Sequence, residues 1–178
     1  MNESALFLDD HDIAASSGLT RVIHPGRKHP KPVMLADRPW EHMLLIGGTV
    51  LKEGELYRMW YESYSKATQY INLYAESDDG IHWRKPVLGR YRDLKGSYEN
   101  NLFLDPEVMN HDNSSVMKTP HMGNGRDYTL IGCRRRSGHH ICFSEDGLRW
   151  TDWSSEPVIP VYGDIGWYTY DDRDRLFR

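Results

Sequence analysis

The sequence predicts an all-β protein built from repeated antiparallel units, and two observations lead to that prediction. The first is an internal repeat, because the frame S-x-D-G-x-x-W occurs at Ser77–Trp83 and again at Ser144–Trp150. The second is that an apolar, alternating run precedes each copy, while helical periodicity is absent from nearly the whole chain. Asp-Gly favours a tight turn, because glycine accepts positive φ and aspartate bonds nearby backbone N–H groups. We expect Trp83 and Trp150 to fold back and pack against their hairpins.

Residues 1–40 are expected to form a leading arm. They are rich in proline, glycine, histidine and lysine and show little periodicity, so we expect them to lie along another surface rather than fold alone. Residues 41–110 are expected to form the first unit and a crossing segment. This unit begins with a strand over 42–51, in which Gly47-Gly48 permits a bulge or a close backbone approach.

The second strand of this unit carries large side chains on both faces. Tyr57, Met59 and Tyr61 point to one face, and the residues between them point to the other. A strand of this kind is covered on both sides, as happens when sheets stack face against face.

The same order of elements returns in residues 111–163, where a strand is expected over 114–118, and it starts a third time in residues 164–178. Because the sequence ends where a further strand is expected, we expect the chain to stop partway through the third unit. Four-stranded antiparallel units that repeat every ~40–70 residues are typical of β-propeller blades. A pair of packed sheets forming a self-contained sandwich is the alternative architecture.

The composition of the chain argues against nucleic acid and membranes as partners. The chain has 178 residues, which suffice for one domain with a core, and its net charge of −4 offers no basic field for nucleic acid or an anionic membrane. No apolar stretch approaches the ~20 residues that span a bilayer, and the first residues lack the pattern of a signal peptide. We therefore expect a soluble, cytoplasmic protein, although a removed leader would leave the compartment open.

The two cysteines, Cys133 and Cys142, are too few for a disulfide framework and lack zinc-ligand spacing. If Ser137-Gly138 is a two-residue turn, the two cysteines face each other across a hairpin. We expect adjacent but reduced thiols, because no export signal is seen. No cofactor or metal is predicted, and a structural calcium ion stays open.

Four segments of the sequence resemble a known family: Asp37–Glu41, Tyr57–Tyr61, Ala75–Pro86 and Glu99–Asn101. They look like bacterial glycosyl-hydrolase-like proteins related to glycoside hydrolase families 43 and 32, which are five-bladed β-propellers that act on furanosides and other glycosides. The resemblance covers nearly the whole chain, as roughly the first half of such a propeller. It implies a five-bladed β-propeller, present here as about two and a half blades.

The resemblance also implies an active site at the centre of the ring, with one acid from the innermost strand of each of the first three blades. These acids act as a base or nucleophile, an aspartate that tunes a pKa, and a general acid. The matching positions are Asp37 or Glu41, Asp112 and Asp164. The W-x-N-D-P-N signature of family 32 is missing, and the third position is aspartate instead of glutamate.

Four neighbouring residues are candidates for contacting a sugar: Trp40, His111, Trp167 and Tyr168. The aromatic rings could stack on a sugar face, and the imidazole could bond a hydroxyl. Each candidate also has a structural interpretation, since aspartates that open strands usually cap turns and tryptophans in blades usually pack in the core. We expect the carboxylates of Glu41 (or Asp37), Asp112 and Asp164 to share one cleft, with Trp40 or Trp167 in its wall.

The sequence therefore favours a glycoside hydrolase-like protein that acts on a saccharide of plant or microbial origin, with or without catalysis in this fragment. The alternative is a non-catalytic module that binds carbohydrate or serves assembly. The expected partner is carbohydrate, and incomplete blade faces predict self-association.

Overall fold

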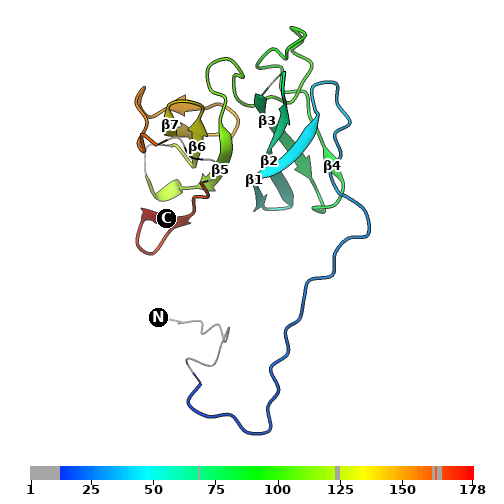
Figure 1. Cartoon of the computed structure of the whole chain (residues 1–178), viewed down its shortest axis with the longest axis vertical. Coiled ribbons are helices and arrows are strands. Elements are labelled where there is room, and N and C mark those ends of the chain that lie inside the picture. Colours follow the sequence, from blue (N-terminus) through cyan, green and yellow to red (C-terminus); the bar gives the residue numbers. More distant parts are fainter. Residues whose placement is uncertain (1–12, 68, 123–124, 162, 164–165) are drawn as a thin grey trace. The chain divides into compact units, whose positions relative to one another are not determined.

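The computed structural model (Figure 1) describes residues 13–67, 69–122, 125–161, 163 and 166–178, and the side chains of residues 45–47 also lie outside the description. The chain divides into two compact units, Met1–Lys31 and Pro32–Arg178. Residues 13–31 of the first unit form no helix or strand. Within the described residues, no helix is both long and apolar enough to cross a membrane.

The second unit is all-β, as the sequence predicts. The first sheet contains four antiparallel strands in sequence order, β1 (Met43–Glu53), β2 (Leu56–Ser65), β3 (Gln69–Ser77) and β4 (Trp83–Arg84). The second sheet repeats this order with β5 (Asp112–Lys118), β6 (Tyr128–Arg134), β7 (Gly138–Ser144) and β8 (Thr151–Asp152). A 3₁₀ turn, η1 (Pro120–Met122), lies between β5 and β6, and β9 (Tyr170–Asp171) pairs with β10 (Leu176–Phe177).

The two Asp-Gly turns have the same geometry. In the first copy, the Ser77 hydroxyl accepts the N–H of Gly80 at 2.8 Å, and Asp79 accepts the next two backbone N–H groups. In the second copy, Ser144 and Asp146 make the corresponding bonds. Both glycines have a φ of 74°, which lies in the left-handed region that glycine adopts without strain. The predicted turns are confirmed.

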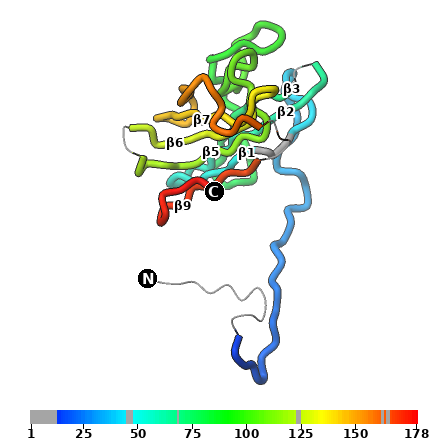
Figure 2. Tube along the Cα trace, turned by 60° about the vertical axis from the view of Figure 1, so that its left-hand side comes forward, coloured from blue at the N-terminus to red at the C-terminus, as the bar shows by residue number. Residues whose placement is uncertain are grey.

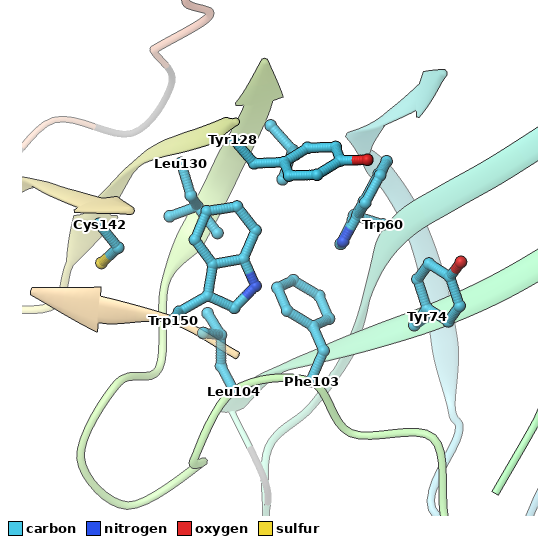
Figure 3. Close-up of a cluster of buried hydrophobic side chains, with 9 residues drawn as sticks. Trp60, Tyr74, Phe103, Leu104, Tyr128, Leu130, Cys142 and Trp150 are labelled. Atoms are coloured by element: carbon cyan, nitrogen blue, oxygen red, sulfur yellow. The ribbon is translucent and has the colours of Figure 1, made fainter. Parts of the chain in front are cut away.

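Strand β2 is covered on both faces, as predicted. On one face Met59 and Tyr61 join an apolar cluster with Leu102. On the other face Trp60 joins a second cluster, which fills the space between the two sheets (Figure 3). The buried residues of this second cluster are Trp60, Tyr74, Phe103, Leu104, Val116, Tyr128, Leu130, Cys142 and Trp150.

The second Asp-Gly turn docks onto β2 of the first sheet. Trp60 donates its Nε1–H to the carbonyl of Gly147 at 2.7 Å, and Arg58 donates to the carbonyl of Asp146 at 2.6 Å. In the first copy, Trp83 donates to the equivalent carbonyl at 3.2 Å. Because Trp60 already occupies the carbonyl of Gly147, the buried Nε1 of Trp150 has no partner among the described residues.

The first strands of successive units lie side by side (Figure 2), and the same kind of bond links each to the next. The N–H of Val116 donates to the Thr49 hydroxyl at 2.9 Å, and the N–H of Tyr168 donates to the Ser115 hydroxyl at 3.1 Å. Thr49 lies opposite Trp60 and Ser115 opposite Ile131, which are matching positions of the repeat. The segment at Tyr168 therefore joins β5 as β5 joins β1.

The predicted cysteine pairing is wrong. Arg134 lies opposite Gly138, so the hairpin loop is Arg135–Ser137, and Cys133 lies opposite His139 instead of Cys142. Both thiols are free and buried, and they lie on opposite faces of the sheet because Cys142 is an odd number of residues beyond His139.

The cysteine pairing was predicted wrongly because Gly138 is not part of the hairpin turn. This residue lies at the start of β7 instead of in the turn, and a Cβ there would be 2.3 Å from the carbonyl oxygen of Ile159. The glycine therefore allows a close approach by a later segment, while Arg136, with a φ of 66°, supplies the turn.

Candidate functional site

Glu41 lies inside a closed polar cluster on the outer face of the first sheet. Its carboxylate accepts hydrogen bonds from the Tyr61 hydroxyl and from the Lys85 ammonium, both at 2.6 Å. It also accepts the backbone N–H groups of Asp37 and Arg38 at 3.0 and 3.1 Å. Burial, first of all, and the neighbouring carboxylate of Glu41 raise the pKa of Tyr61 far above its usual range. Glu41 is thus a paired and fully engaged charge.

Asp37 is an exposed neighbour of this cluster. Lys85 donates to its carboxylate at 2.7 Å, and this hydrogen bond holds the pKa of Asp37 below its usual value. Lys85 itself is buried and also donates to the carbonyl of Leu35 at 2.7 Å. One lysine therefore binds two of the predicted acids and the backbone of the segment before them.

Asn101 completes the cluster. Its side-chain amide donates to the Tyr61 hydroxyl at 2.8 Å and accepts the Nε1–H of Trp40 at 2.9 Å. Together with Glu41 and Lys85, these residues come from all four segments that resemble the glycosyl-hydrolase-like family. The segments meet here and fasten the residues that precede β1 onto the first sheet.

Asp112 lies at the start of β5, which contacts the face of β2 opposite to the face that carries Tyr61. It is buried at the start of β5, where Glu62 of β2 accepts the N–H groups of Asn113 and Ser114 at 3.1 and 2.8 Å. Tyr61 and Glu62 are consecutive in β2 and point to opposite faces, so the cluster around Glu41 and the cluster at Asp112 are separated by the sheet. Among the described residues, Glu41 thus contacts the face of β2 that carries Tyr61, whereas the start of β5 contacts the face that carries Glu62.

The strand register also distinguishes the two positions. Asp112 lies opposite Cys133 in the second sheet, and the matching pair in the first sheet is Leu45 opposite Glu62. Glu41 comes before Leu45 in the chain, so it is not the residue of the first sheet that matches Asp112.

The carboxyl group of Glu62 has a raised pKa. Burial, the largest cause, and the charge of Asp112 raise this pKa to about 7, although hydrogen bonds from the start of β5 act against the rise.

The remaining predicted residues have separate partners. His111 is buried and accepts a hydrogen bond from Arg134 at 3.0 Å, and burial lowers its pKa to about 3. Tyr168 bonds His139 through its hydroxyl at 2.7 Å, whereas Trp167 is 57% exposed. Asp164 lies outside the described residues.

A groove with a volume of about 560 Å³ lies over the outer face of the first sheet. Ile71 and Leu102, both buried, contribute apolar surface to it, and Trp40 lines it on the side of the segment that precedes β1. The facing wall belongs to the crossing segment between the sheets. The groove residues are Pro39, Trp40, His42, Ile71, Arg92–Gly96, Leu102, Pro106 and Glu107, and we call this the Trp40 groove.

Hydrogen bonds order the wall formed by the crossing segment. The Asp93 carboxylate accepts the backbone N–H groups of Lys95 and Ser97, both at 2.9 Å. The Arg92 guanidinium lies over the Tyr98 ring, 5.2 Å from its centroid. A second cavity of about 300 Å³ shares Arg92 and Glu107 with the Trp40 groove.

Trp40 is predicted from the sequence, whereas the facing residues Arg92, Lys95 and Glu107 are not. The available signal was the density of charge in a stretch without strand periodicity between Pro86 and Asn100. In the part of the protein that the structure describes, no group of three or more His, Cys, Asp or Glu side chains could hold a metal ion.

Comparison with known proteins gives little further information. No protein-family model matches the sequence, and no curated protein sequence matches it. A solved structure described as a BT0996 RGII complex is 16% identical and matches with a TM-score of 0.26. The match covers 68% of this protein and 60% of the matched one.

Proposed function

We propose that this protein is part of a carbohydrate-binding β-propeller and that it binds saccharide in the Trp40 groove. The observation that carries the proposal is the groove itself, which combines an anchored indole, an apolar floor and a polar wall. Pockets for small ligands have this composition, with apolar surface for contact area and a few polar groups for orientation. An aromatic ring with its N–H already bonded offers a rigid apolar surface to a sugar ring.

The propeller part of the proposal is supported by the repeated link between first strands. The first sheet is linked to the second by the hydroxyl of Thr49, and the second sheet is linked to the segment at Tyr168 by the hydroxyl of Ser115. These two hydroxyl groups occupy matching positions of the repeat. Successive blades of a propeller are related in this way by a rotation about a central axis. The repeated link and the resemblance to glycosyl-hydrolase-like proteins together favour a five-bladed ring over a sandwich of two sheets.

Binding is favoured over catalysis by the state of the predicted acids. Glu41, the predicted acid before the first strand, is neutralised by Lys85 and bonded on both oxygens. A catalytic carboxyl must reach the glycosidic oxygen or its attacking water, which a fully bonded buried group cannot do.

The test is a binding screen of the whole protein against plant and microbial polysaccharides, followed by titration of the best ligand. We expect Trp40→Ala to lower the affinity by about tenfold or more, because a central aromatic anchor is lost. Trp153→Ala is the matched control, since this tryptophan is 62% exposed and lies outside the groove. Thermal melting of each variant separates lost binding from lost folding.

Two results would contradict the proposal: no polysaccharide binds, or Trp40→Ala and Trp153→Ala bind equally well. Trp40→Phe provides a second variant if the alanine protein does not fold, because it keeps most of the apolar contact with the core.

A glycosidase is the second candidate, and the charge of Asp112 near the buried Glu62 favours it. Burial, first of all, and the nearby charge of Asp112 raise the pKa of Glu62 to about 7, and a carboxyl group with such a pKa can act as an acid near neutral pH. In this candidate the catalytic acids include Asp112 and Asp164. Asp112→Asn would then abolish hydrolysis of the bound saccharide, whereas a pure binding protein would keep its affinity and show no hydrolysis before or after the change.

A further inference from the structure

We propose that the saccharide bound in the Trp40 groove is anionic and that Arg92 and Lys95 bind its carboxylates. This inference rests on the proposed function and adds the chemical class of the ligand. It starts from two cations that line one groove and have no acidic partner among the described residues.

The side chains of Arg92 and Lys95 form no ion pair or hydrogen bond with any described residue, although both line the groove. By contrast, two cations whose side chains are buried against the first sheet are neutralised within the fold. Lys85 binds Glu41 and Asp37, and Arg58 binds Glu53. The two groove cations therefore keep their donors for an external acceptor.

The Arg92 guanidinium is held by an aromatic ring, a contact that uses none of its N–H groups. Its guanidinium lies over the Tyr98 ring at 5.2 Å, an attraction between the positive charge and the ring face. This contact orients the planar group and leaves its N–H groups free for the two-pronged binding that a carboxylate accepts. Because Arg92 lines both cavities of the crossing segment, one guanidinium is available to sugars in either one.

Hydrogen bonds within the loop fix the backbone at Lys95. Asp93 accepts the N–H groups of Lys95 and Ser97, and Gly96 has a φ of 79°, so the loop turns tightly at this point. An oxygen of the Asp93 carboxylate is thereby used within the loop. The acid left in the groove is Glu107, which could accept sugar hydroxyl groups.

Charge and shape together indicate a uronate-containing saccharide. Trp40 and the apolar floor suit a sugar ring, and the two groove cations suit carboxylates on that ring or on its neighbours. A neutral sugar would offer both cations only uncharged acceptors, which bind Arg and Lys more weakly than a carboxylate does, and an acidic peptide would not need the indole. The expected ligand is a polymer or oligomer of uronic acid residues.

The test compares polygalacturonate with the same polymer after full methyl esterification, which removes the charge and keeps the sugar backbone. We expect the whole protein to bind polygalacturonate about tenfold more tightly, because charged hydrogen bonds are lost on esterification. This preference is expected to weaken with added salt, as surface charge interactions do. Binding is measured in the presence of a chelator, so that calcium bridging does not contribute.

The variants are Arg92→Gln, Lys95→Gln and the double variant, with Lys66→Gln as the control. Lys66 is an exposed lysine in the loop between β2 and β3 and does not line the groove. We expect the double variant to bind both polymers with equal affinity, and Lys66→Gln to keep the tenfold preference. Melting curves check that each variant is folded.

The outcomes separate the two proposals. If the esterified polymer or another neutral polysaccharide binds as tightly as polygalacturonate, in a manner that depends on Trp40, the anionic class is wrong and the saccharide groove stands. If no saccharide binds, or Trp40→Ala has no effect, the proposed function itself fails. Equally tight binding of polyglutamate, unaffected by Trp40→Ala, would identify an acidic peptide site and overturn the inference.

Discussion

At the residue scale, the contact between the second Asp-Gly turn and the first sheet depends on a missing side chain. A Cβ on Gly147 would lie 2.9 Å from the Trp60 ring and 3.0 Å from the Arg58 guanidinium. The guanidinium cannot retreat freely, because it also binds Glu53 and Tyr128 and stacks on Trp60. One glycine thus serves both a left-handed turn and the packing of two sheets.

We predict that Gly147→Ala lowers the free energy of unfolding by about 2–4 kcal/mol, from left-handed strain together with overpacking. Gly80→Ala is the matched control. Gly80 has the same φ of 74°, but its Cβ would meet only the Tyr57 ring at 3.7 Å. That control is expected to cost only the strain, about 1–2 kcal/mol. Equal losses in chemical denaturation would show that the packing of this turn on the first sheet does not contribute to stability.

A second residue-scale prediction concerns the pH dependence of stability at Glu62. Its pKa in the folded protein is raised to about 7, so between its ordinary value and pH 7 the folded state holds more protons than the unfolded state. The stability contributed by this proton is present at low pH and is lost as the pH rises through 7. Glu62→Gln is therefore expected to gain stability relative to the natural protein between pH 4.5 and pH 7.

Denaturation curves of both proteins at several pH values measure this difference directly. Because the comparison subtracts groups that are the same in both proteins, the opposite contribution of His111 cancels. A difference in unfolding free energy that stays constant across this range would mean that Glu62 is ionised normally in the fold.

At the element scale, the segment before β1 is held to the first sheet by a buried ion pair. The side chains of Lys85 and Glu41 are 4% and 0% exposed, and their charged atoms are 2.6 Å apart. Removing one partner would leave an uncompensated charge, which costs far more than removing both.

Lys85→Met is therefore predicted to lower stability by about 3–5 kcal/mol, and the double variant Glu41→Gln/Lys85→Met to recover much of that loss. The same variants test the proposed function, because Trp40 lies next to Glu41 and the groove would open if the segment were released. If the single and double variants unfold at the same denaturant concentration, the pair is not what holds the segment.

At this scale, local features of the fold follow from the sequence and long-range contacts do not. The strands and the two Asp-Gly turns were predictable, because alternation and turn chemistry are local. The hairpin at Gly138 was not, because that glycine is needed for the approach of Ile159, which is distant in the sequence. Glu41 was chosen as a candidate from its place before a strand, and its pairing with Lys85 exists only in the folded protein. Arg92 and Lys95 lie in an irregular segment, where no periodicity indicates a direction.

At the scale of the whole molecule, apolar surface remains exposed around the second sheet and the segment that follows it. The exposed residues there are Trp153, Val158, Ile159, Val161 and Trp167. Where such side chains form a contiguous patch on a soluble protein, the patch usually marks a contact surface.

We predict concentration-dependent self-association of this protein, weakened in the double variant Trp153→Ser/Trp167→Ser. Sedimentation velocity over a wide range of protein concentrations measures it. A protein that stays monomeric at the highest concentration would indicate that this surface is not an interface and would favour the self-contained sandwich.

The central claim is that saccharide binds beside Trp40, on the outer face of the first sheet. Backbone amide chemical shifts recorded during titration with the bound saccharide test it most directly, because they locate the ligand without any mutation. We predict that the largest changes fall on residues 40–42, 92–96 and 102, all of which belong to the groove or flank it. Changes confined to the start of β5 around Asp112 would place the ligand at the centre of a ring and contradict the claim.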